Sequence, residues 1–376
     1  MLTKDSKILF ISNTAHLGGA ESSLLDVVSI LTGSFQAIVA LPGNGRLAQK
    51  LQMMAALYFV KLIRFKRNGA FGLAPQLWQL FKGVIRISRI VVSEKVGCIY
   101  ANTTQAYLYA LPVKLITGRP LIWHLRDNLP GARLTWLLSF FADKIICVSD
   151  HLLQQLPHKD KAYLVYNGID TRNWRRPVRS EGGLRTELGL DRKKLIIAHI
   201  GQLIPWKRHE LFIEVASKIL NHNSNVHCVI IGSDLFNDST SYKALLVKKI
   251  KSLDLTNHLT MMNHRENILC KLADVDVLVH LAEQEPFGRI LVEAMSLEIP
   301  IVAMNSGGPA EVVIEGQSGF LMDNSKPQDI AKKICLLLNS PSLREKFGKE
   351  ARRLVEDKFN LNSLEKIRDI IFSLND

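Results

Sequence analysis

The stretch LIIAHIGQLIPWKR, residues 195–208, decides the fold. Its first seven residues are mostly apolar and predict a buried strand, and a polar loop then leads into a helix-period pattern. The same alternation of short apolar runs with longer helical segments continues on both sides of this stretch. Such a rhythm is typical of parallel sheets whose strands are joined by right-handed crossover helices.

The alternation falls into two blocks, separated by a charged, glycine-containing stretch at 171–194 that predicts a linker. The expected strands are 8–12, 37–41, 59–62, 98–101, 121–124, 144–148 and 162–166 in the first block, and 195–201, 226–231, 277–281 and 301–303 in the second. A chain of 376 residues is long enough to build two cores. We therefore expect an α/β protein with two Rossmann-like, doubly wound domains, 1–170 and 171–359.

The composition favours an intracellular protein that meets anions. A net charge of +13 attracts nucleic acid, a membrane face or phosphorylated ligands, and charge alone does not choose among them. The five cysteines have no metal-ligand or paired spacing, which indicates reduced thiols. The first residues carry no cleavable apolar leader, and no run of about 18 apolar residues predicts a membrane-spanning helix. We expect a cytoplasmic protein, and no nucleic-acid-binding module is recognisable.

Two polar loops follow predicted strands and lead into helices. In HLGGAE, Gly18 and Gly19 allow close approach of backbone N–H groups to an anion, although a plain tight turn explains the motif equally well. In the second loop Lys207 precedes a helix, where the helix macrodipole disfavours a cation. Because a solvated lysine is a poor explanation for that placement, we expect Lys207 to bind an anion at the carboxyl end of the sheet.

Residues 285–295, EPFGRILVEAM, hold two spaced carboxylates. Gly288 allows a tight turn into a helix that carries Glu293, and N–H groups near Phe287 and Gly288 would face a phosphate. Glu285 and Glu293 could accept strong, charge-assisted hydrogen bonds from sugar hydroxyls, or could simply be acids favoured at a helix start. The segment NSGGPAEVV, residues 305–313, would bring a second helix start to the same ligand.

The order of these motifs carries a family resemblance. GGAE, then WH at a strand end, VSD, NGID, G-x-L-x-P-x-K, EPFGRILVEAM and GGPAE resemble the family 4 glycosyltransferases of the GT-B fold, over nearly the whole chain. The resemblance implies two domains facing a central cleft, with the last helix, 360–376, packing back on the first domain. It also implies a retaining, metal-independent transfer of a hexose from a nucleotide-diphosphate sugar to a glycan or lipid-linked acceptor of cell-surface polysaccharide synthesis.

The family's motifs also suggest roles for single residues. Glu285 would bind hydroxyls of the donor sugar, Glu293 the ribose of the nucleotide, and Lys207 the diphosphate. His124, in IWHLRD, matches the histidine beside the reacting sugar, so that His124, Lys207 and Glu285 form the expected catalytic set. Gly18 and Gly19 match the glycine turn near the donor phosphate.

One donor-site position departs from the family pattern. Gln202 stands where the family usually has arginine, which removes one charge-assisted donor worth on the order of 2–4 kcal/mol. Either Arg208 or Arg126 compensates, or the enzyme is slow. A catalytically silent, sugar-nucleotide-binding subunit is therefore one alternative function, and a sugar-nucleotide 2-epimerase of the same fold is the other.

Two further features have competing interpretations. Asp274 and Asp276 match the DxD of metal-dependent transferases, but Asp276 precedes an apolar strand, and we expect no metal there. His280, on that strand, is expected to be a buried core residue.

A basic stripe forms the last of these features. Lys82, Arg86 and Arg89 recur at helical spacing on a segment whose other positions, such as Trp78 and Phe81, are apolar. The stripe is either the solvated side of a packed helix or a docking surface for the anionic inner face of a membrane, worth about 1 kcal/mol per basic residue.

Overall fold

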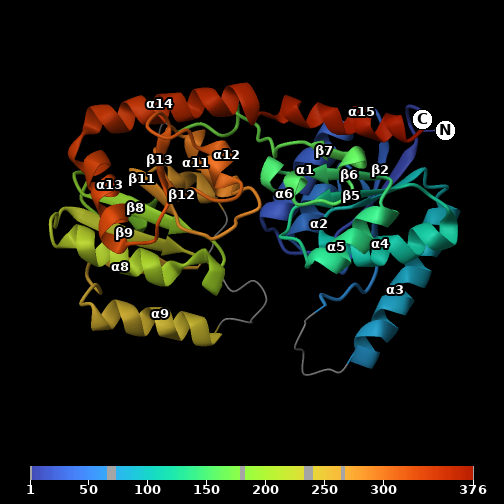
Figure 1. The fold of residues 1–376 in the computed structure, drawn as a ribbon, viewed down its shortest axis with the longest axis horizontal. Helices are drawn as coiled ribbons and strands as arrows, with labels where there is room; N and C mark the ends of the chain where they lie inside the picture. The colour runs from blue at the N-terminus through green and yellow to red at the C-terminus, as the bar shows by residue number, and fades with distance from the viewer. Residues whose placement is uncertain (1, 66–72, 178–182, 233–239, 264–266, 376) are drawn as a thin grey trace. The chain divides into compact units, whose positions relative to one another are not determined.

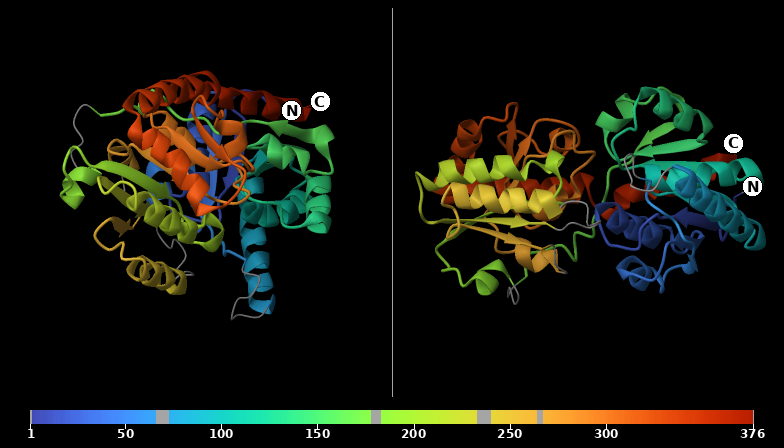
Figure 2. Two further views of the ribbon diagram at one scale, coloured as in Figure 1. Left: turned by 60° about the vertical axis from the view of Figure 1, so that its left-hand side comes forward. Right: turned by 90° about the horizontal axis from the view of Figure 1, so that it is seen from below.

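The computed structural model describes residues 2–65, 73–177, 183–232, 240–263 and 267–375. The chain forms two compact units, Met1–Gly168 together with Leu361–Asp376 (unit 1), and Ile169–Asn360 (unit 2). The sequence suggested boundaries at 170 and 359 for the same parts. Each unit is a parallel sheet with helices on both faces (Figures 1 and 2), so the expected α/β, doubly wound architecture is confirmed.

Unit 1 contains a seven-stranded parallel sheet in the order β3-β2-β1-β4-β5-β6-β7. Its strands are β1 (Lys7–Ile11), β2 (Gln36–Leu41), β3 (Ala56–Phe59), β4 (Cys98–Ala101), β5 (Leu121–Leu125), β6 (Lys144–Cys147) and β7 (Ala162–Leu164). Its helices are α1 (Gly19–Leu31), α2 (Arg46–Leu51), α3 (Leu73–Ser93), α4 (Thr104–Thr117), α5 (Ala132–Phe141), α6 (Asp150–Gln154) and α15 (Lys366–Phe372). The central strands are buried throughout, as both faces of a doubly wound sheet require.

The terminal helix α15 belongs to the core of unit 1. Its Ile367, Ile370 and Ile371 are buried in the same cluster as apolar residues of α1, α2 and the sheet. The ring of Phe372 lies 4.9 Å from that of Phe35, which precedes β2. Burial of these side chains, at about 25 cal/mol per Å² of apolar surface, holds the last helix to the first domain.

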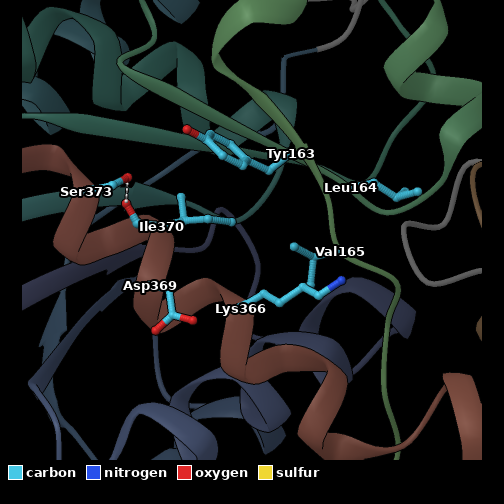
Figure 3. A pocket seen from close by; sticks show the side chains of 7 residues that line it. All are labelled: Tyr163, Leu164, Val165, Lys366, Asp369, Ile370 and Ser373. Carbon is cyan, nitrogen blue, oxygen red and sulfur yellow. Dashed lines mark hydrogen bonds between the residues drawn. The ribbon is translucent and has the colours of Figure 1, made fainter.

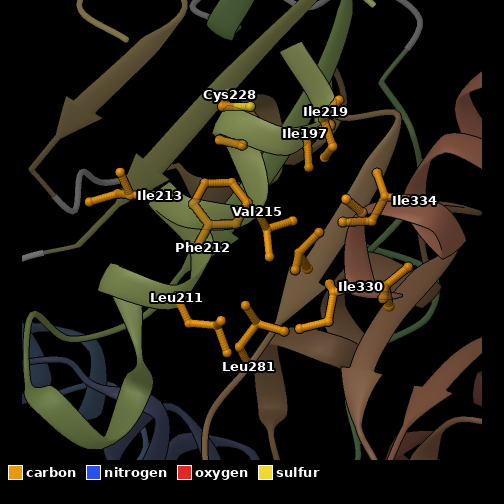
Figure 4. Packing of buried hydrophobic residues seen from close by; sticks show 14 of the residues in the cluster. Ile197, Leu211, Phe212, Ile213, Val215, Ile219, Cys228, Leu281, Ile330 and Ile334 are labelled. Atoms are coloured by element: carbon orange, nitrogen blue, oxygen red, sulfur yellow. The ribbon is translucent and has the colours of Figure 1, made fainter. Parts of the chain in front are cut away.

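Unit 2 contains a six-stranded parallel sheet in the order β10-β9-β8-β11-β12-β13. Its strands are β8 (Leu195–Ile200), β9 (Val226–Ile231), β10 (Leu259–Met262), β11 (Val277–His280), β12 (Ile301–Met304) and β13 (Gly319–Met322). Its helices are α7 (Leu184–Leu188), α8 (His209–Leu220), α9 (Thr240–Ser252), α10 (Ile268–Leu272), α11 (Arg289–Met295), α12 (Pro309–Val312), α13 (Pro327–Asn339) and α14 (Pro341–Lys358). Figure 4 shows one side of its core, where Phe212 and Val215 of α8 and Ile330 and Ile334 of α13 pack on β8 and β11.

The sequence prediction was wrong at three strands. It placed β3 at 59–62 instead of Ala56–Phe59, and it missed β10 and β13. All three are edge strands of their sheets, and β3 and β10 have half-exposed or exposed positions. Partial burial accounts for the errors at β3 and β10, because an edge strand needs less apolar surface than a central one. It does not account for β13, which is mostly buried, and the edge strand β7 was predicted.

Candidate active site

The topology of unit 2 points to one end of its sheet. Chain order reverses between the neighbouring strands β8 and β11, so the loops that follow them diverge to opposite faces. In doubly wound sheets, ligands bind outside the carboxyl ends of the strands at such a switch point. The loop after β8 carries Lys207, and the loop after β11 carries Glu285.

Lys207 lies on a short 3₁₀ turn, Pro205–Lys207, rather than on the helix itself. Its side chain packs across Gly201, and its Nζ lies 4.2 Å from the centre of the Trp206 ring. The ammonium forms an ion pair with the Glu285 carboxylate, and both side chains are 12% exposed. Lys207 is therefore a sheltered charge with a fixed partner, and the interpretation as a solvated surface lysine is wrong.

Glu285 joins this pair to a histidine. Its Oε2 accepts from Lys207 Nζ and lies 3.3 Å from Nε2 of His280, the last residue of β11. Burial raises the pKa of the Glu285 carboxyl, but Lys207 and His280 more than offset this and lower it to about 2. Burial lowers the pKa of His280, which leaves a neutral ring that donates from Nε2 to the carboxylate. His280 is buried as expected, and its partner is a predicted site residue.

The next turn positions Glu293. Gly288 has a φ of +87°, a conformation that side-chain-bearing residues rarely adopt, and it immediately precedes α11. Glu293 lies on the second turn of that helix, where its Oε1 accepts from Arg289 Nε at 2.8 Å. Both side chains of this pair are nearly buried.

The loop after β12 braces the loop after β11. The N–H of Gly308 donates to the Glu285 carbonyl at 2.8 Å. A Cβ atom on Gly308 would lie only 2.3 Å from Phe287 Cα, so the two backbones touch at this point. The GGPAE segment thus supports the backbone that carries Glu285 and Phe287, and α12 begins directly after it at Pro309.

A second histidine supports the same site. His199, on β8, has Nδ1 2.9 Å from the Val279 carbonyl and Nε2 3.0 Å from the Lys207 carbonyl. A neutral imidazole has one N–H, so it donates to only one of these two acceptors. The sequence analysis did not select His199, although a polar residue inside an apolar strand near its carboxyl end was a visible signal.

Gln202 and Arg208 flank the lysine turn. Gln202 is half-buried, and its carbonyl accepts from Ile204 N at 2.8 Å. The guanidinium of Arg208 donates to Ser325 Oγ at 2.6 Å and lies 3.1 Å from a Glu283 carboxylate oxygen. Arg208 therefore already has partners and would have to exchange them to replace the missing arginine.

The carboxylates of the DxD-like segment lie before β11, at the opposite end of that strand from Glu285. Asp274 and Asp276 both contact Arg185, and Asp276 Oδ2 accepts from the backbone N–H of Ile196 at 2.8 Å. These contacts join α7 to the beginning of β8. Within the residues that the structure describes, no group of three or more His, Cys, Asp or Glu side chains has the arrangement of a metal site.

In unit 1 the glycine turn lies at the start of α1. Gly18 is extended, and its N–H donates to Glu21 Oε2 at 3.2 Å. The position that a Cβ of Gly19 would occupy has no described atom within 4 Å. Glu21 is buried, and burial together with the charge of Asp127 raises its pKa to about 7.

His124 lies on β5 and is fully buried. Its Nδ1 contacts Tyr100 Oη and lies 3.1 Å from Nη2 of Arg126, which is always protonated and therefore donates. The proton of the neutral ring is then on Nε2, a buried atom with no partner among the described residues. Burial and the Arg126 charge lower the pKa of His124 well below its ordinary value.

Arg126 is held in place by two asparagines that the sequence analysis missed. Its Nε donates to Asn102 Oδ1 at 3.1 Å, and its Nη1 donates to Asn167 Oδ1. Asn102 directly follows β4, a position whose side chain falls at the carboxyl end of the sheet, and this was the available signal. Arg126 is thus committed to the His124 network in unit 1.

One groove in unit 1 lies apart from all these residues. It has a volume of about 440 Å³ and lies between β7 and α15 in unit 1, with Tyr163, Lys366 and Asp369 in its lining (Figure 3). None of the predicted site residues lines it.

Two family models match the chain. "Glycosyltransferase Family 4" matches residues 17–173, and "Glycosyl transferases group 1" matches residues 183–354. Spore coat protein SA of Bacillus subtilis is 31% identical over 232 residues, 57% of this chain, and the match spans 61% of that protein's length. The capsular polysaccharide biosynthesis glycosyltransferase CapM of Staphylococcus aureus is 25% identical over 308 residues, 76% of this chain and 78% of its own length.

The fold is also similar to solved structures. The crystal structure of Anabaena HepE in complex with UDP and glucose superposes with a TM-score of 0.84 at 25% identity, covering 98% of this chain and 99% of that one. Two parallel α/β units of this kind, in this order, constitute the GT-B fold.

Proposed function

Because the chain belongs to the family 4 glycosyltransferases, we propose that it moves a hexose from a nucleoside-diphosphate sugar to a glycan or lipid-linked acceptor, with retention of anomeric configuration. The observation that carries this proposal is the sheltered Lys207–Glu285–His280 cluster at the switch point of unit 2. The HepE complexes with UDP and with UDP-glucose make a uridine nucleotide the first donor to test.

The cluster has the charges that a diphosphate sugar requires. Lys207 would turn its ammonium toward the diphosphate, and Glu285 would accept hydrogen bonds from the sugar hydroxyls in its place. Each buried charge then keeps a partner, which matters because an unpaired buried charge costs several kcal/mol. Glu293, on the second turn of α11, would accept from the ribose hydroxyls, and the N–H groups near Phe287 and Gly288 would face a phosphate.

His124 would act as a hydrogen-bond donor rather than as a base. Arg126 and Tyr100 occupy Nδ1, so only Nε2–H is left for the sugar or the acceptor. Because the pKa of the ring is well below its ordinary value, this donor stays neutral across physiological pH. Gly18 and Gly19 would offer backbone N–H groups to a donor phosphate.

We propose that no metal takes part. Lys207 supplies the positive charge that a metal ion otherwise supplies to a leaving diphosphate, and the Asp274 and Asp276 carboxylates are committed to Arg185. Transfer should therefore continue in excess EDTA. Complete loss of transfer that manganese restores would contradict the proposal.

A donor screen tests the activity. UDP-, GDP- and ADP-sugars are first ranked by the rise in melting temperature, since a ligand at 100 times its Kd adds about 2.7 kcal/mol of stability. The best donor is then incubated alone and with polyprenyl-phosphate-linked or capsular glycan acceptors, and the products are identified by NMR. Epimer formation without an acceptor would favour the 2-epimerase, and donor binding without any turnover would favour the silent subunit.

The acceptor side suggests a membrane. We propose that Lys82, Arg86 and Arg89, which are all exposed on α3, attract the anionic inner face of a membrane. No helix in the described part of the chain is long and apolar enough to span a bilayer. We propose a cytoplasmic location with peripheral binding to that face.

A further inference from the structure

The outer side of α5 is apolar and open to solvent. Leu134 is 40% exposed, Trp136 52%, Leu137 43% and Phe140 53%, and we call these four side chains the α5 face. The opposite side of the helix, with Thr135, Leu138 and Ser139, is buried. An isolated exposed leucine needs no explanation, but four large apolar side chains within about two turns form a patch of the kind that marks an interaction site.

The α5 face is held rigidly. The rings of Trp136 and Phe140 stack with centres 5.6 Å apart and planes 13° apart. Behind them, Tyr107 Oη of α4 donates to the Leu138 carbonyl at 2.8 Å, and Lys114 Nζ donates to the Phe141 carbonyl at 2.7 Å. The exposed aromatic pair is therefore a fixed feature of the folded domain.

One basic side chain contacts the α5 face, and others lie near it in the chain. Lys161 Nζ lies 5.8 Å from the centre of the Phe140 ring and donates to the Phe140 carbonyl. Arg133, which directly precedes Leu134, and Lys159, two residues before Lys161, are both exposed. Of the nearby acids, Asp143 is paired with Lys114, and Asp160 is exposed. An aromatic surface with a cationic rim matches the chemistry of an anionic lipid interface.

The same arrangement occurs on α3. Trp78 and Phe81 are 55% and 54% exposed, their rings stack 5.7 Å apart, and Lys82 Nζ lies 4.9 Å over the Trp78 ring. The sequence analysis treated these aromatic positions only as the apolar side of a basic helix, and the structure places them in solvent. Helix α3 packs on α4, where Gly83 lies against the Tyr109 ring, and Tyr107 of α4 bonds to α5. The two stacked pairs therefore lie on helices that both contact α4.

We propose that the α5 face inserts into the headgroup region of an anionic bilayer, alongside the basic stripe of α3. A second copy of this chain is a poor occupant, because a symmetric contact would bring two basic rims of +13 chains together. The inference extends the proposed membrane association and concerns residues outside the donor site. The result of its test is therefore independent of whether the proposed sugar transfer is correct.

Cosedimentation of the full chain with phosphatidylcholine vesicles, with and without phosphatidylglycerol, tests this inference. Trp136→Ser combined with Phe140→Ser should reduce partitioning about 10-fold at low and at high salt, because apolar insertion is not screened. Lys82→Gln, Arg86→Gln and Arg89→Gln together should reduce partitioning mainly at low salt. Leu245→Ser with Leu336→Ser, two exposed leucines of unit 2, is the matched control and should bind like the wild type.

A second readout does not depend on the polar substitutions. Brominated lipids should quench the tryptophan fluorescence of the wild type more than that of Trp136→Phe, which keeps an aromatic ring in place. Donor turnover in the absence of vesicles should be unchanged in the α5 variant. Wild-type partitioning by that variant, or a dimer in sedimentation equilibrium that the variant abolishes, would overturn the inference.

Discussion

Lys207, Glu285 and His280 form one nearly buried cluster without net charge. The ammonium and the carboxylate neutralise each other, and the neutral imidazole adds a hydrogen bond. A ligand that enters this cluster has to replace each contact that it breaks, which selects for a molecule with an anionic group next to hydroxyl groups. A diphosphate sugar meets that requirement, and an uncharged sugar does not.

Alanine substitutions of Lys207 and of Glu293 should separate an effect on catalysis from an effect on donor binding. The negative charge on the diphosphate grows as the glycosidic bond breaks, so Lys207→Ala should lower kcat roughly 10²-fold or more. Glu293→Ala removes a contact remote from the reacting centre and should mainly raise the KM for the donor. Steady-state kinetics on both variants measures the contrast, and the reverse pattern would show that the assigned roles are wrong.

Glu21 should make stability depend on pH. Its pKa is about 7 in the folded protein against an ordinary value of 4.5, so the folded state holds a proton that the unfolded state has lost between these values. Stability from this group is therefore full below about 4.5 and falls as the pH rises through 7.

Glu21→Gln should remove that dependence. The amide keeps an acceptor for the Gly18 N–H but has no charge to bury, so the variant should match the wild type below about pH 4 and be more stable above pH 7, by roughly 3 kcal/mol. Thermal melts across this range measure the difference. A constant difference between the two proteins at every pH would contradict the explanation.

At the scale of elements, two loops act as one support. The backbone of the loop after β12 touches the backbone of the loop after β11 at Gly308 and Phe287. The backbone of the loop after β11 is held in place, because its residue Glu285 bonds to Lys207 and to His280. The loop after β11 is therefore positioned by packing as well as by its own hydrogen bonds.

Gly308→Ala should consequently disturb both stability and donor binding. Overpacking of this kind costs about 1–3 kcal/mol, or roughly 2–4 °C in melting temperature for each kcal/mol in a domain of this size. Gly43→Ala is the matched control, since a Cβ there meets nothing within 4 Å. If Gly308→Ala melts like Gly43→Ala and keeps its donor KM, the two loops are not coupled.

The basic stripe of α3 makes a prediction at the same scale. Lys82→Gln, Arg86→Gln and Arg89→Gln should weaken binding to anionic vesicles and flatten its dependence on salt, because surface charges are screened within about 10 Å at 0.1 M salt. The helix should stay folded, since its buried side consists of residues such as Val84 and Ile87. Unchanged binding would identify the stripe as ordinary solvated surface.

The elements also show where sequence reasoning stops. Central strands such as β9, buried at every position, were predicted within a residue because both faces demand apolar side chains. The edge strands β3 and β10, whose burial is partial, were misplaced or missed, although the equally exposed edge strand β7 was predicted. The Arg126 network escaped for another reason: Asn102 and Asn167 are 65 residues apart in the chain, and only the strand order brings them to one guanidinium.

At the scale of the molecule, the two units share one sheet topology but carry different site residues. Both sheets reverse their chain order once, between β8 and β11 in unit 2 and between β1 and β4 in unit 1. The loops after β8, β11 and β1 carry predicted site residues, and His124 lies on β5, one strand beyond the reversal. Unit 2 provides a cation and two carboxylates there, and unit 1 provides a glycine turn and a neutral histidine. The order of the motifs along the chain sufficed to predict this distribution, whereas the contacts within each cluster required the structure.

The central claim is that Lys207, without a metal, stabilises the diphosphate as it leaves. The most direct test is calorimetric titration of UDP and of the intact UDP-sugar in excess EDTA, on the wild type and on Lys207→Ala. UDP carries the charge that develops on the leaving group, so the substitution should weaken UDP binding clearly more than UDP-sugar binding. Equal losses for the two ligands, or UDP binding that requires a divalent metal, would contradict the claim.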